Sequence, residues 1–290
     1  MTVIKTENLT YTYSVGTPFE KTAVKDVSLE IESGDMIGII GHTGSGKSTL
    51  IQHFNGLMKP TSGKVYVDGQ DIWDSKTTNI RDIRFKVGLV FQYPEYQIFE
   101  ETVRRDIAFG PRNMGLDEKE VERRVLETAE LVGISEEILN KSPFELSGGQ
   151  KRRVAIAGVM AMEPKVLILD EPTAGLDPAG RDLVMEQIKK FHDRTGATVL
   201  LVSHSMEDVA KFASKIIVMN RSELFCFDDT PEVFKKADEI TAMGLSVPQI
   251  TKVFGRLKKA GLDIRSDVYT IDFAVKQLSE YIKTHGKENI

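Results

Sequence analysis

The chain of 290 residues is 41% hydrophobic and 28% charged, a composition typical of globular proteins that disfavours peptide hormones, collagens and disordered chains. The chain is close to the length at which a single hydrophobic core no longer grows with added residues, so we expect one large domain with an appendage. The 38 Lys and Arg residues are outnumbered by 43 Asp and Glu residues, and the net charge of -5 disfavours DNA and RNA as partners.

The sequence also indicates where the chain works. Cys226 is the single cysteine and cannot form an internal disulfide, and residues 1–10 contain Lys5 and Glu7 instead of the apolar core of a signal peptide. The apolar stretch 154–162 is far shorter than the roughly 20 residues of a membrane-spanning helix. We therefore expect a cytoplasmic protein, whose contact with any membrane would pass through other chains.

The first third of the chain predicts strands followed by a helix. Alternating hydrophobic residues over 3–13 and 27–31 predict two antiparallel strands joined by a loop. A buried strand is predicted over 36–40, and apolar residues at helical spacing predict a helix that begins at Lys47. The order is therefore strand, glycine-rich loop, helix.

The middle and last thirds differ in pattern. Residues 103–109 and 117–132 predict charged amphipathic helices, with no strong strand between Phe91 and Glu163. Strands that alternate with helices are then predicted over 166–169, 198–202 and 216–219. This alternation indicates an α/β fold with a mostly parallel sheet.

These changes of pattern divide the chain into three predicted parts. An α/β core comprises residues 1–92 and 163–225, and a helical subdomain, 93–162, is inserted into it. Residues 226–290 form a small C-terminal appendage, predicted as α/β, that is broken by glycines and prolines and ends in an amphipathic helix.

A glycine-rich loop joins the strand 36–40 to the following helix. Its sequence matches the loop of P-loop NTPases: Gly41, His42, Thr43, Gly44, Ser45, Gly46, Lys47 and Ser48. Glycines let the backbone N–H groups wrap phosphates, and the helix N-terminus adds partial positive charge. Lys47 would reach the β- and γ-phosphates and Ser48 would ligate Mg²⁺, with Thr49 completing the predicted cofactor-binding set. A chance glycine-rich turn is the alternative, which the flanking strand and helix disfavour.

Two carboxylates end the apolar run 166–169. Asp170 would hold Mg²⁺ through water, and Glu171 would act as general base on the attacking water. The ligand edge of a parallel sheet lies at the carboxyl ends of its strands, where both residues are expected. Solvated acids at a strand end are the alternative, which becomes improbable beside a phosphate-binding loop.

A second anion-binding helix start is predicted ahead of a helix that begins near Lys151. It consists of Ser147, Gly148, Gly149 and Gln150, preceded by Leu146. An enzyme that closes on one ATP alone needs only one such loop. In a pair of subunits facing head to tail, however, the second loop of each subunit could contact the nucleotide bound by the other. The chain thus resembles the ATP-binding cassette (ABC) ATPases, whose signature sequence is Leu-Ser-Gly-Gly-Gln.

The resemblance implies roles for further residues. Tyr13 would stack on adenine, with Tyr11 as the competing choice. Gln92 would contact Mg²⁺ and the attacking water, Asp177 would lie at the dimer interface, and His204 would contact the γ-phosphate. The resemblance also implies a P-loop NTPase fold, with a RecA-like core, an antiparallel β subdomain and a helical signature subdomain. The chain is therefore expected to be an active ATPase.

Finer similarities point to one group of ABC proteins. Segments 90–99, 102–111 and 150–158 resemble the ATPases of energy-coupling factor (ECF) transporters, which take up vitamins and transition-metal ions. Segments 17–20 and 41–43 look like the A′-type paralogue of a shared, group II machine. An ordinary ABC importer or exporter ATPase is the alternative, and a soluble ABC ATPase is a more distant one.

The ECF resemblance implies ATP and Mg²⁺ as cofactors and several partners. These are a second ATPase subunit, identical or paralogous, a transmembrane T component and substrate-binding S components, which place the chain peripherally at the cytoplasmic face of the cell membrane. Glu95, Glu100 and Glu101 would suit basic coupling residues, or else form a solvated acidic face. The tail from Pro231 resembles a dimer-contact domain, with a regulatory unit or a lid as alternatives.

Overall fold

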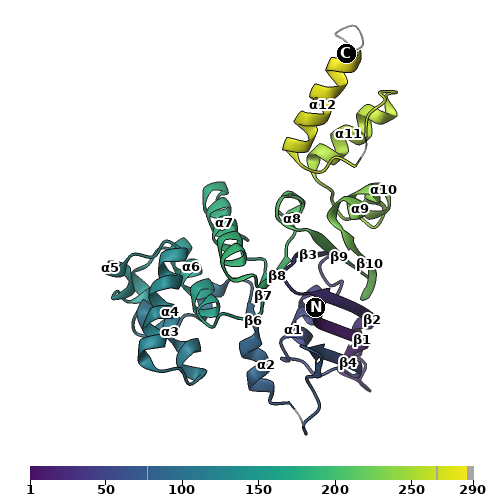
Figure 1. Cartoon of the computed structure of the whole chain (residues 1–290). Coiled ribbons are helices and arrows are strands. Elements are labelled where there is room, and N and C mark those ends of the chain that lie inside the picture. Colours follow the sequence, from purple (N-terminus) through teal and green to yellow (C-terminus); the bar gives the residue numbers. More distant parts are fainter. Residues whose placement is uncertain (77, 266, 286–290) are drawn as a thin grey trace.

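The computed structural model describes residues 1–76, 78–265 and 267–285 (Figure 1). At its centre is a six-stranded sheet in the order β10-β9-β3-β8-β7-β6. Strands β9 to β6 run parallel, and β10 is an antiparallel edge strand. The strands are β3 (Met36–Gly41), β6 (Val87–Val90), β7 (Val166–Asp170), β8 (Thr198–Val202), β9 (Lys215–Asn220) and β10 (Glu223–Asp229). The predicted α/β fold with a mostly parallel sheet is confirmed.

Alternate residues of the central strands face opposite sides of the sheet. In β7, Leu167 packs with α7 (Pro178–Thr195) and with the helical subdomain, whereas Ile168 packs on the side of α1 (Lys47–Phe54). Because both faces are covered, every residue of β3, β6, β7 and β8 is buried. The carboxyl ends of these strands are thereby held at one edge of a rigid sheet.

A second sheet is antiparallel, in the order β2-β1-β4-β5. Its strands are β1 (Thr2–Tyr13), β2 (Lys21–Glu32), β4 (Ser62–Val67) and β5 (Gln70–Asp71). The pairing of β1 with β2 confirms the predicted antiparallel pair. Leu50 and Phe54 of α1 share one buried cluster with Ile4 of β1 and Ile39 of β3, so α1 is packed between the two sheets.

The inserted subdomain is helical. It contains η1 (Pro94–Gln97), α3 (Val103–Asn113), α4 (Glu118–Leu131), α5 (Glu136–Leu139), η2 (Pro143–Glu145) and α6 (Gly148–Met160). Residues 91–163 are described throughout and include no strand, as predicted. Thr102, Asp117 and Ser147 cap the N-termini of α3, α4 and α6 with their side-chain oxygens. The core contributes two more helices, α2 (Ile80–Lys86) and α8 (Met206–Phe212).

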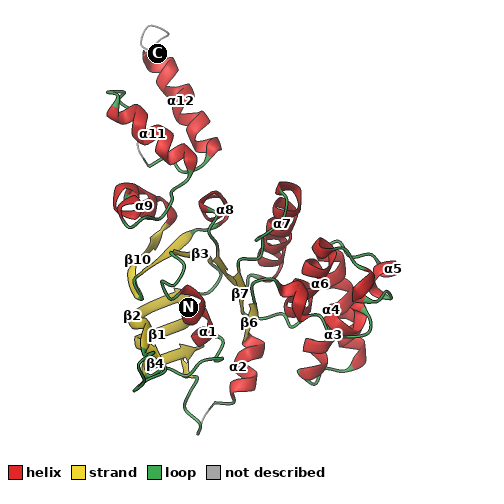
Figure 2. Ribbon diagram, turned by 180° about the vertical axis from the view of Figure 1, so that it is seen from behind, coloured by secondary structure: helices red, strands yellow, loops and turns green. Residues whose placement is uncertain are grey.

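The C-terminal segment differs from the prediction in two ways. The predicted boundary at residue 226 falls inside β10, because Leu224 and Phe227 pack on one side of this strand and Cys226 on the other, which continues the sheet. The prediction of an α/β appendage is wrong for the described residues after Asp229, which form helices and loops (Figure 2). The helices are α9 (Thr230–Lys235), α10 (Ala237–Ala242), α11 (Gln249–Lys259) and α12 (Ile271–His285).

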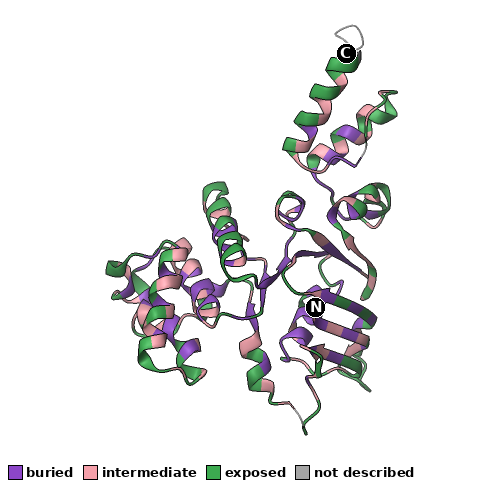
Figure 3. Ribbon diagram, in the orientation of Figure 1, coloured by how far each residue is buried: buried purple, intermediate pink, exposed green. Residues whose placement is uncertain are grey.

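The C-terminal helices fall into two groups. Val233 of α9 and Ile240 of α10 pack with Ile216 and Val218 of the central sheet. By contrast, α11 and α12 stand away from the core as a pair, and Figure 3 shows much of α12 exposed. Within the described ranges no helix is both long and apolar enough to span a membrane.

Candidate functional site

The glycine-rich loop lies between β3 and α1, where the sequence predicted it. Gly46 caps α1 in a left-handed conformation, with φ of 101°. A Cβ atom at Gly46 would lie 2.1 Å from the carbonyl oxygen of Ala23 in β2, so only glycine fits. Gly44 also has positive φ, +81°, but no atom lies within 4 Å of the place where its Cβ would be. The backbone of β2 therefore lies directly against one side of the loop.

Lys47 spans this loop. Its buried Nζ donates to the carbonyl oxygens of Gly41, at 2.7 Å, and of His42, at 3.0 Å. Burial lowers the pKa of Lys47, and the charges of Glu171 and Asp170 oppose this shift. The ammonium group is thus held at the phosphate-binding loop, within reach of two carboxylates.

A cavity of about 260 Å³ collects residues from four places in the chain. It is lined by Thr43, Gly44, Gly46, Lys47, Ser48, Thr49, Gln92, Asp170, Glu171, Val202 and His204. These residues end or follow β3, β6, β7 and β8, whose carboxyl ends meet at one edge because the strands are parallel. Val202 was not among the predicted site residues, although its place at the end of a predicted strand could have indicated it.

Asp170 and Ser48 bring oxygen atoms together in the cavity. Asp170 ends β7 and is buried. Burial raises the pKa of Asp170, whereas the hydrogen bond from the Ser48 hydroxyl and the charge of Lys47 lower it. A carboxylate beside a hydroxyl, with the Gln92 side chain lining the same cavity, is a set of hard oxygen donors that Mg²⁺ prefers. The residues present therefore fit the expected ion.

Glu171 is placed by a strained backbone. Its φ of 52° is left-handed, which is unfavourable for a residue with a Cβ atom. Its Oε1 is buried without a hydrogen-bond partner and lies 3.4 Å from Nε2 of His204. Burial raises the pKa of Glu171, and the charge of His204 lowers it. A buried carboxylate oxygen that no donor occupies can accept a proton from a molecule bound in the cavity.

The signature residues lie outside this cavity. Ser147 and Gln150 form a capping box, in which the Ser147 hydroxyl accepts from the Gln150 N–H and the Gln150 side chain accepts from the Ser147 N–H. Because Ser147 caps the helix, α6 begins at Gly148, and the predicted start near Lys151 is wrong. A Cβ atom at Gly148 or Gly149 would meet no atom within 4 Å, so the helix start is open. Asp177, the predicted interface residue, caps α7 and also lies outside the cavity.

The two tyrosines near the loop differ in their surroundings. Tyr13 ends β1 and is 36% exposed, and its hydroxyl lies 3.1 Å from the Thr49 hydroxyl in the first turn of α1. Tyr11 packs against the buried core and against the ring of His53, with 5.0 Å between ring centroids. Tyr13 therefore has more surface open to a ligand, although it does not line the cavity itself.

The three glutamates of the predicted acidic groove differ in their surroundings. Glu95 forms a largely buried ion pair with Arg152 of α6, and Glu101 forms one with Arg105 of α3 in which both side chains are exposed. Glu95 is therefore engaged within the chain. The same region also exposes aromatic side chains, with Tyr96 84% and Phe99 63% exposed.

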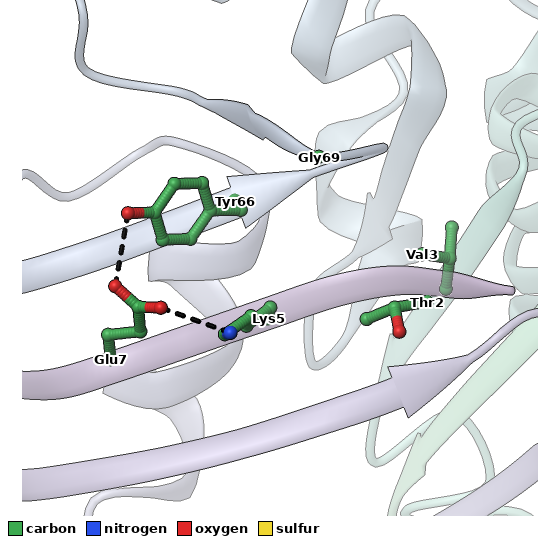
Figure 4. Close-up of a pocket in the computed structure, with 6 residues that line it drawn as sticks. All are labelled: Thr2, Val3, Lys5, Glu7, Tyr66 and Gly69. Atoms are coloured by element: carbon green, nitrogen blue, oxygen red, sulfur yellow. Dashed lines mark hydrogen bonds and ion pairs between the residues drawn. The ribbon is translucent and has the colours of Figure 1, made fainter.

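Another hollow, of about 300 Å³, lies on the antiparallel sheet (Figure 4). It is remote from the phosphate-binding loop in the sequence and shares no lining residue with the cavity described above. Its charged groups are already paired, because Lys5 lies 3.0 Å from both Glu7 and Glu30, and the Tyr66 hydroxyl donates to Glu7. The charged side chains that line this hollow, Lys5 and Glu7, therefore already have partners within the chain.

Comparisons with known proteins agree with this geometry. The family described as ABC transporter matches residues 24–174. The energy-coupling factor transporter ATP-binding protein EcfA2 of Caldanaerobacter subterraneus subsp. tengcongensis is 55% identical over 287 residues, 99% of either chain. The protein of the same name from Clostridium acetobutylicum is 57% identical over 282 residues, 97% of this chain and 98% of the relative. This chain is an ECF transporter ATPase.

Solved structures support the assignment of this ECF ATPase. The cbiO1 protein of Clostridium perfringens, part of the ABC transporter complex cbiONQ, is 39% identical, with a TM-score of 0.73 over 89% of this chain and 99% of that one. The cassette MJ0796, solved as a dimer bound to ADP and Pi, is 32% identical, with a TM-score of 0.69 over 78% and 98% of the two chains. As an ABC ATPase, the chain binds ATP and couples its hydrolysis to transport.

Proposed function

We propose that this ECF ATPase works in a head-to-tail pair that closes on two ATP molecules with Mg²⁺. The observation that carries the proposal is the open helix start at Ser147, which has no part in the chain's own cavity. Such a helix start attracts phosphate through its N–H groups and its partial positive charge. The similar cassette MJ0796 is a dimer with ADP and Pi bound. Asp177 and the signature residues would then complete the site of the partner subunit.

Within each site, different residues would bind Mg²⁺, the phosphates and the adenine of ATP. Ser48, Asp170 and Gln92 would hold Mg²⁺, which screens the phosphate charge when bound. Lys47 and the N–H groups of the glycine-rich loop, Gly41 to Gly46, stabilise negative charge on the β- and γ-phosphates. Tyr13 would stack on adenine. Lys47 and the glycine-rich loop are held in place by contacts within the chain, so the phosphate-binding groups need little reorganisation during the reaction.

Glu171 and His204 act on the attacking water. The buried Oε1 of Glu171 accepts a proton from that water, which makes Glu171 the proposed general base. His204 is 57% exposed and borders both Glu171 and the cavity, so its ring can contact the γ-phosphate. Its position beside Glu171 also lets it orient the carboxylate.

The same proposal extends to membrane partners. The exposed Tyr96 and Phe99 follow Gln92, which lines the cavity, closely in the chain and would give a transmembrane T component an apolar surface. Separate S components would bind the substrate, a vitamin or a transition-metal ion. The chain would thus lie peripherally on the cytoplasmic face of the membrane and contact the membrane only through its partners. Nucleic acid would not be among these partners.

We also propose that the second ATPase is a paralogue and that the C-terminal helices contribute to the pair. Ile271, Val275 and Ile282 of α12 are 73%, 59% and 42% exposed and lie four and seven residues apart, which places them along one stripe of the helix. An apolar stripe of this kind suits a partner surface.

The proposal is tested by purifying the chain from detergent-solubilised membranes and identifying its partners by mass spectrometry. Recovery of a second cassette ATPase, one T-like membrane protein and small membrane proteins would support it. Recovery of two large permease subunits would instead indicate an ordinary ABC transporter.

The dimer mechanism has its own test, a Ser147→Arg variant. We expect the isolated chain to bind ATP normally and the assembled complex to lose turnover, because Ser147 acts at the partner's nucleotide. Loss of ATP binding by the isolated chain would contradict this arrangement.

A further inference from the structure

Arg152 is a buried arginine in the first half of α6, two residues after Gln150. Its side chain is only 3% exposed. Its Nε donates to Oε2 of Glu95 at 3.0 Å, and its Nη2 donates to Oε1 of Glu95 at 2.7 Å. This two-point contact fixes the guanidinium plane, which a single-point lysine contact would not do.

The remaining guanidinium nitrogen reaches a different part of the chain. Nη1 of Arg152 donates to the carbonyl oxygen of Ala174 and, at 3.4 Å, to that of Pro172. Both carbonyls belong to the loop between Glu171 and Asp177. Arg152 therefore joins three segments: the η1 helix that follows Gln92, the α6 helix that begins within the signature, and the loop that follows Glu171.

Other arginines of the helical subdomain have a different setting. Arg104 pairs with Glu122, and these side chains are 25% and 46% exposed. Arg123 and Arg124 pair with Glu120, Glu127 and Glu163, whose side chains are 31%, 33% and 41% exposed. A buried ion pair is costly to break, but in general it is no more stable than apolar residues packed in its place, so stability alone does not account for the placement of Arg152.

We propose that Arg152 is a positioning residue that holds the loop 172–177 in register with the segment after Gln92 and with the signature helix. Because Pro172 follows Glu171 directly, displacement of the helical subdomain would be transmitted through Arg152 to the carboxylate that faces the water. The inference rests on the roles of Gln92, Ser147 and Glu171 proposed above and adds a residue that connects them.

The test compares Arg152→Lys with Glu122→Gln in the assembled transporter complex. Lysine keeps the charge at position 152 but lacks the planar fork with which Arg152 holds both oxygens of Glu95 and reaches two carbonyl groups. Glu122→Gln weakens an ion pair of the same subdomain that does not involve Arg152. We expect Arg152→Lys to lower kcat by about 10- to 100-fold with KM for ATP little changed, because misplacement of a catalytic group by about 1 Å has this effect. Glu122→Gln should leave kcat near the wild-type value.

Hydrogen exchange separates positioning from general destabilisation. The N–H groups of Ala174 and Leu176 donate to the carbonyl oxygens of Glu171 and Thr173 within this loop. We expect faster exchange at these two amides in Arg152→Lys, without faster exchange through the rest of the sheet. Wild-type kcat together with wild-type exchange at these amides would overturn the proposal.

Two further variants keep the test decisive. If Arg152→Lys does not fold, Glu95→Gln removes the same charge contact from the other side and should change kcat and loop exchange in the same direction. Glu171→Gln tests the proposed site itself. Normal turnover of Glu171→Gln would contradict the proposed role of Glu171. If Glu171→Gln loses turnover while Arg152→Lys and Glu95→Gln keep it, only the proposed role of Arg152 is overturned.

Discussion

At the residue scale, two carboxylates, Glu171 and Glu95, have different surroundings and therefore different pKa values. Glu171 has a buried oxygen without a donor, and burial raises its pKa. Burial also raises the pKa of Glu95, but the hydrogen bonds and charge of Arg152, together with a backbone hydrogen bond, outweigh it, so that the pKa of Glu95 lies below its usual value of 4.5. A carboxylate beside a guanidinium stays charged, whereas one that faces a cavity can exchange a proton.

The Glu95 pair predicts a dependence of stability on pH. Since folding lowers the pKa of Glu95, the ion pair stabilises the fold above the pKa of the unfolded chain, and this stability is lost as pH falls through the lower pKa of the folded protein. We expect Glu95→Gln to lower the free energy of unfolding by about 1.5–3 kcal/mol near neutral pH. The difference from wild type should shrink in acid, as measured by urea unfolding at a series of pH values.

Glu122→Gln serves as the matched control for this experiment. Glu122 is 46% exposed, so its pair with Arg104 contributes about 0–1 kcal/mol. A difference between Glu95→Gln and wild type that stayed constant over the whole pH range would show that the charge of Glu95 is not responsible.

At the element scale, β2 and α1 shape the phosphate-binding loop together. The loop leaves β3, and Gly46 brings its backbone against Ala23 of β2 before α1 begins. A helix start placed between two sheets cannot shift without disturbing both, because Leu50 and Phe54 are fully buried there. The N–H groups that we propose to bind phosphate are therefore held in place.

Two glycines of the loop give a paired prediction. Gly46→Ala places a Cβ atom 2.1 Å from the Ala23 carbonyl oxygen, whereas Gly44→Ala meets no atom within 4 Å and carries only the strain of positive φ. That strain is about 1–2 kcal/mol. We expect Gly46→Ala to abolish ATP binding and Gly44→Ala to weaken it modestly, as measured by nucleotide titration. Equal effects of the two substitutions would show that the contact with β2 is unimportant.

At the scale of the whole molecule, the C-terminal segment touches the phosphate-binding loop. The ring of His42 forms a hydrogen bond through Nε2 with the carbonyl oxygen of Met243, just after α10. Gly244 follows in a left-handed conformation, with φ of +77°. Since α10 also packs on the central sheet through Ile240, the segment has a fixed position from which to influence the loop.

A substitution at Gly244 tests this contact. A Cβ atom there would lie 3.3 Å from Cε1 of His42, which must move by a few tenths of an ångström. We expect Gly244→Ala to weaken ATP binding several-fold in a nucleotide titration. Gly261→Ala is the control, since Gly261 also has positive φ but its Cβ would meet nothing within 4 Å. If both variants bind ATP equally, the contact with His42 does not affect the loop.

The exposed stripe of α12 gives a prediction about assembly. Val275→Glu places a charge on this stripe without disturbing the buried Ala274 beside it. We expect the variant to weaken pairing of the ATPase subunits, measured by sedimentation, while the melting temperature of the isolated chain stays unchanged. Lys276→Glu, on another exposed position of α12, is the control. Unchanged pairing of Val275→Glu would argue against a dimer contact through this stripe.

Local patterns were sufficient for most of the fold and for the contiguous motifs. The strand 198–202 was predicted with the observed bounds, because a fully buried strand is a continuous apolar run. The start of α6 and the boundary of the C-terminal appendage were predicted wrongly. The start of α6 follows from the local capping box of Ser147 and Gln150, whereas the boundary depends on the pairing of β10 with β9, which composition does not reveal.

The sequence by itself determined the glycine-rich loop, the acidic pair Asp170–Glu171, the signature and the family, because each is a short run whose chemistry is local. Only the tertiary structure decided which of these residues share a cavity, and that Glu95 is held by Arg152, 57 residues away, and His42 by Met243, 201 residues away. The physical reason is that such contacts arise where separate elements pack together, and no periodicity along the chain records which elements become neighbours.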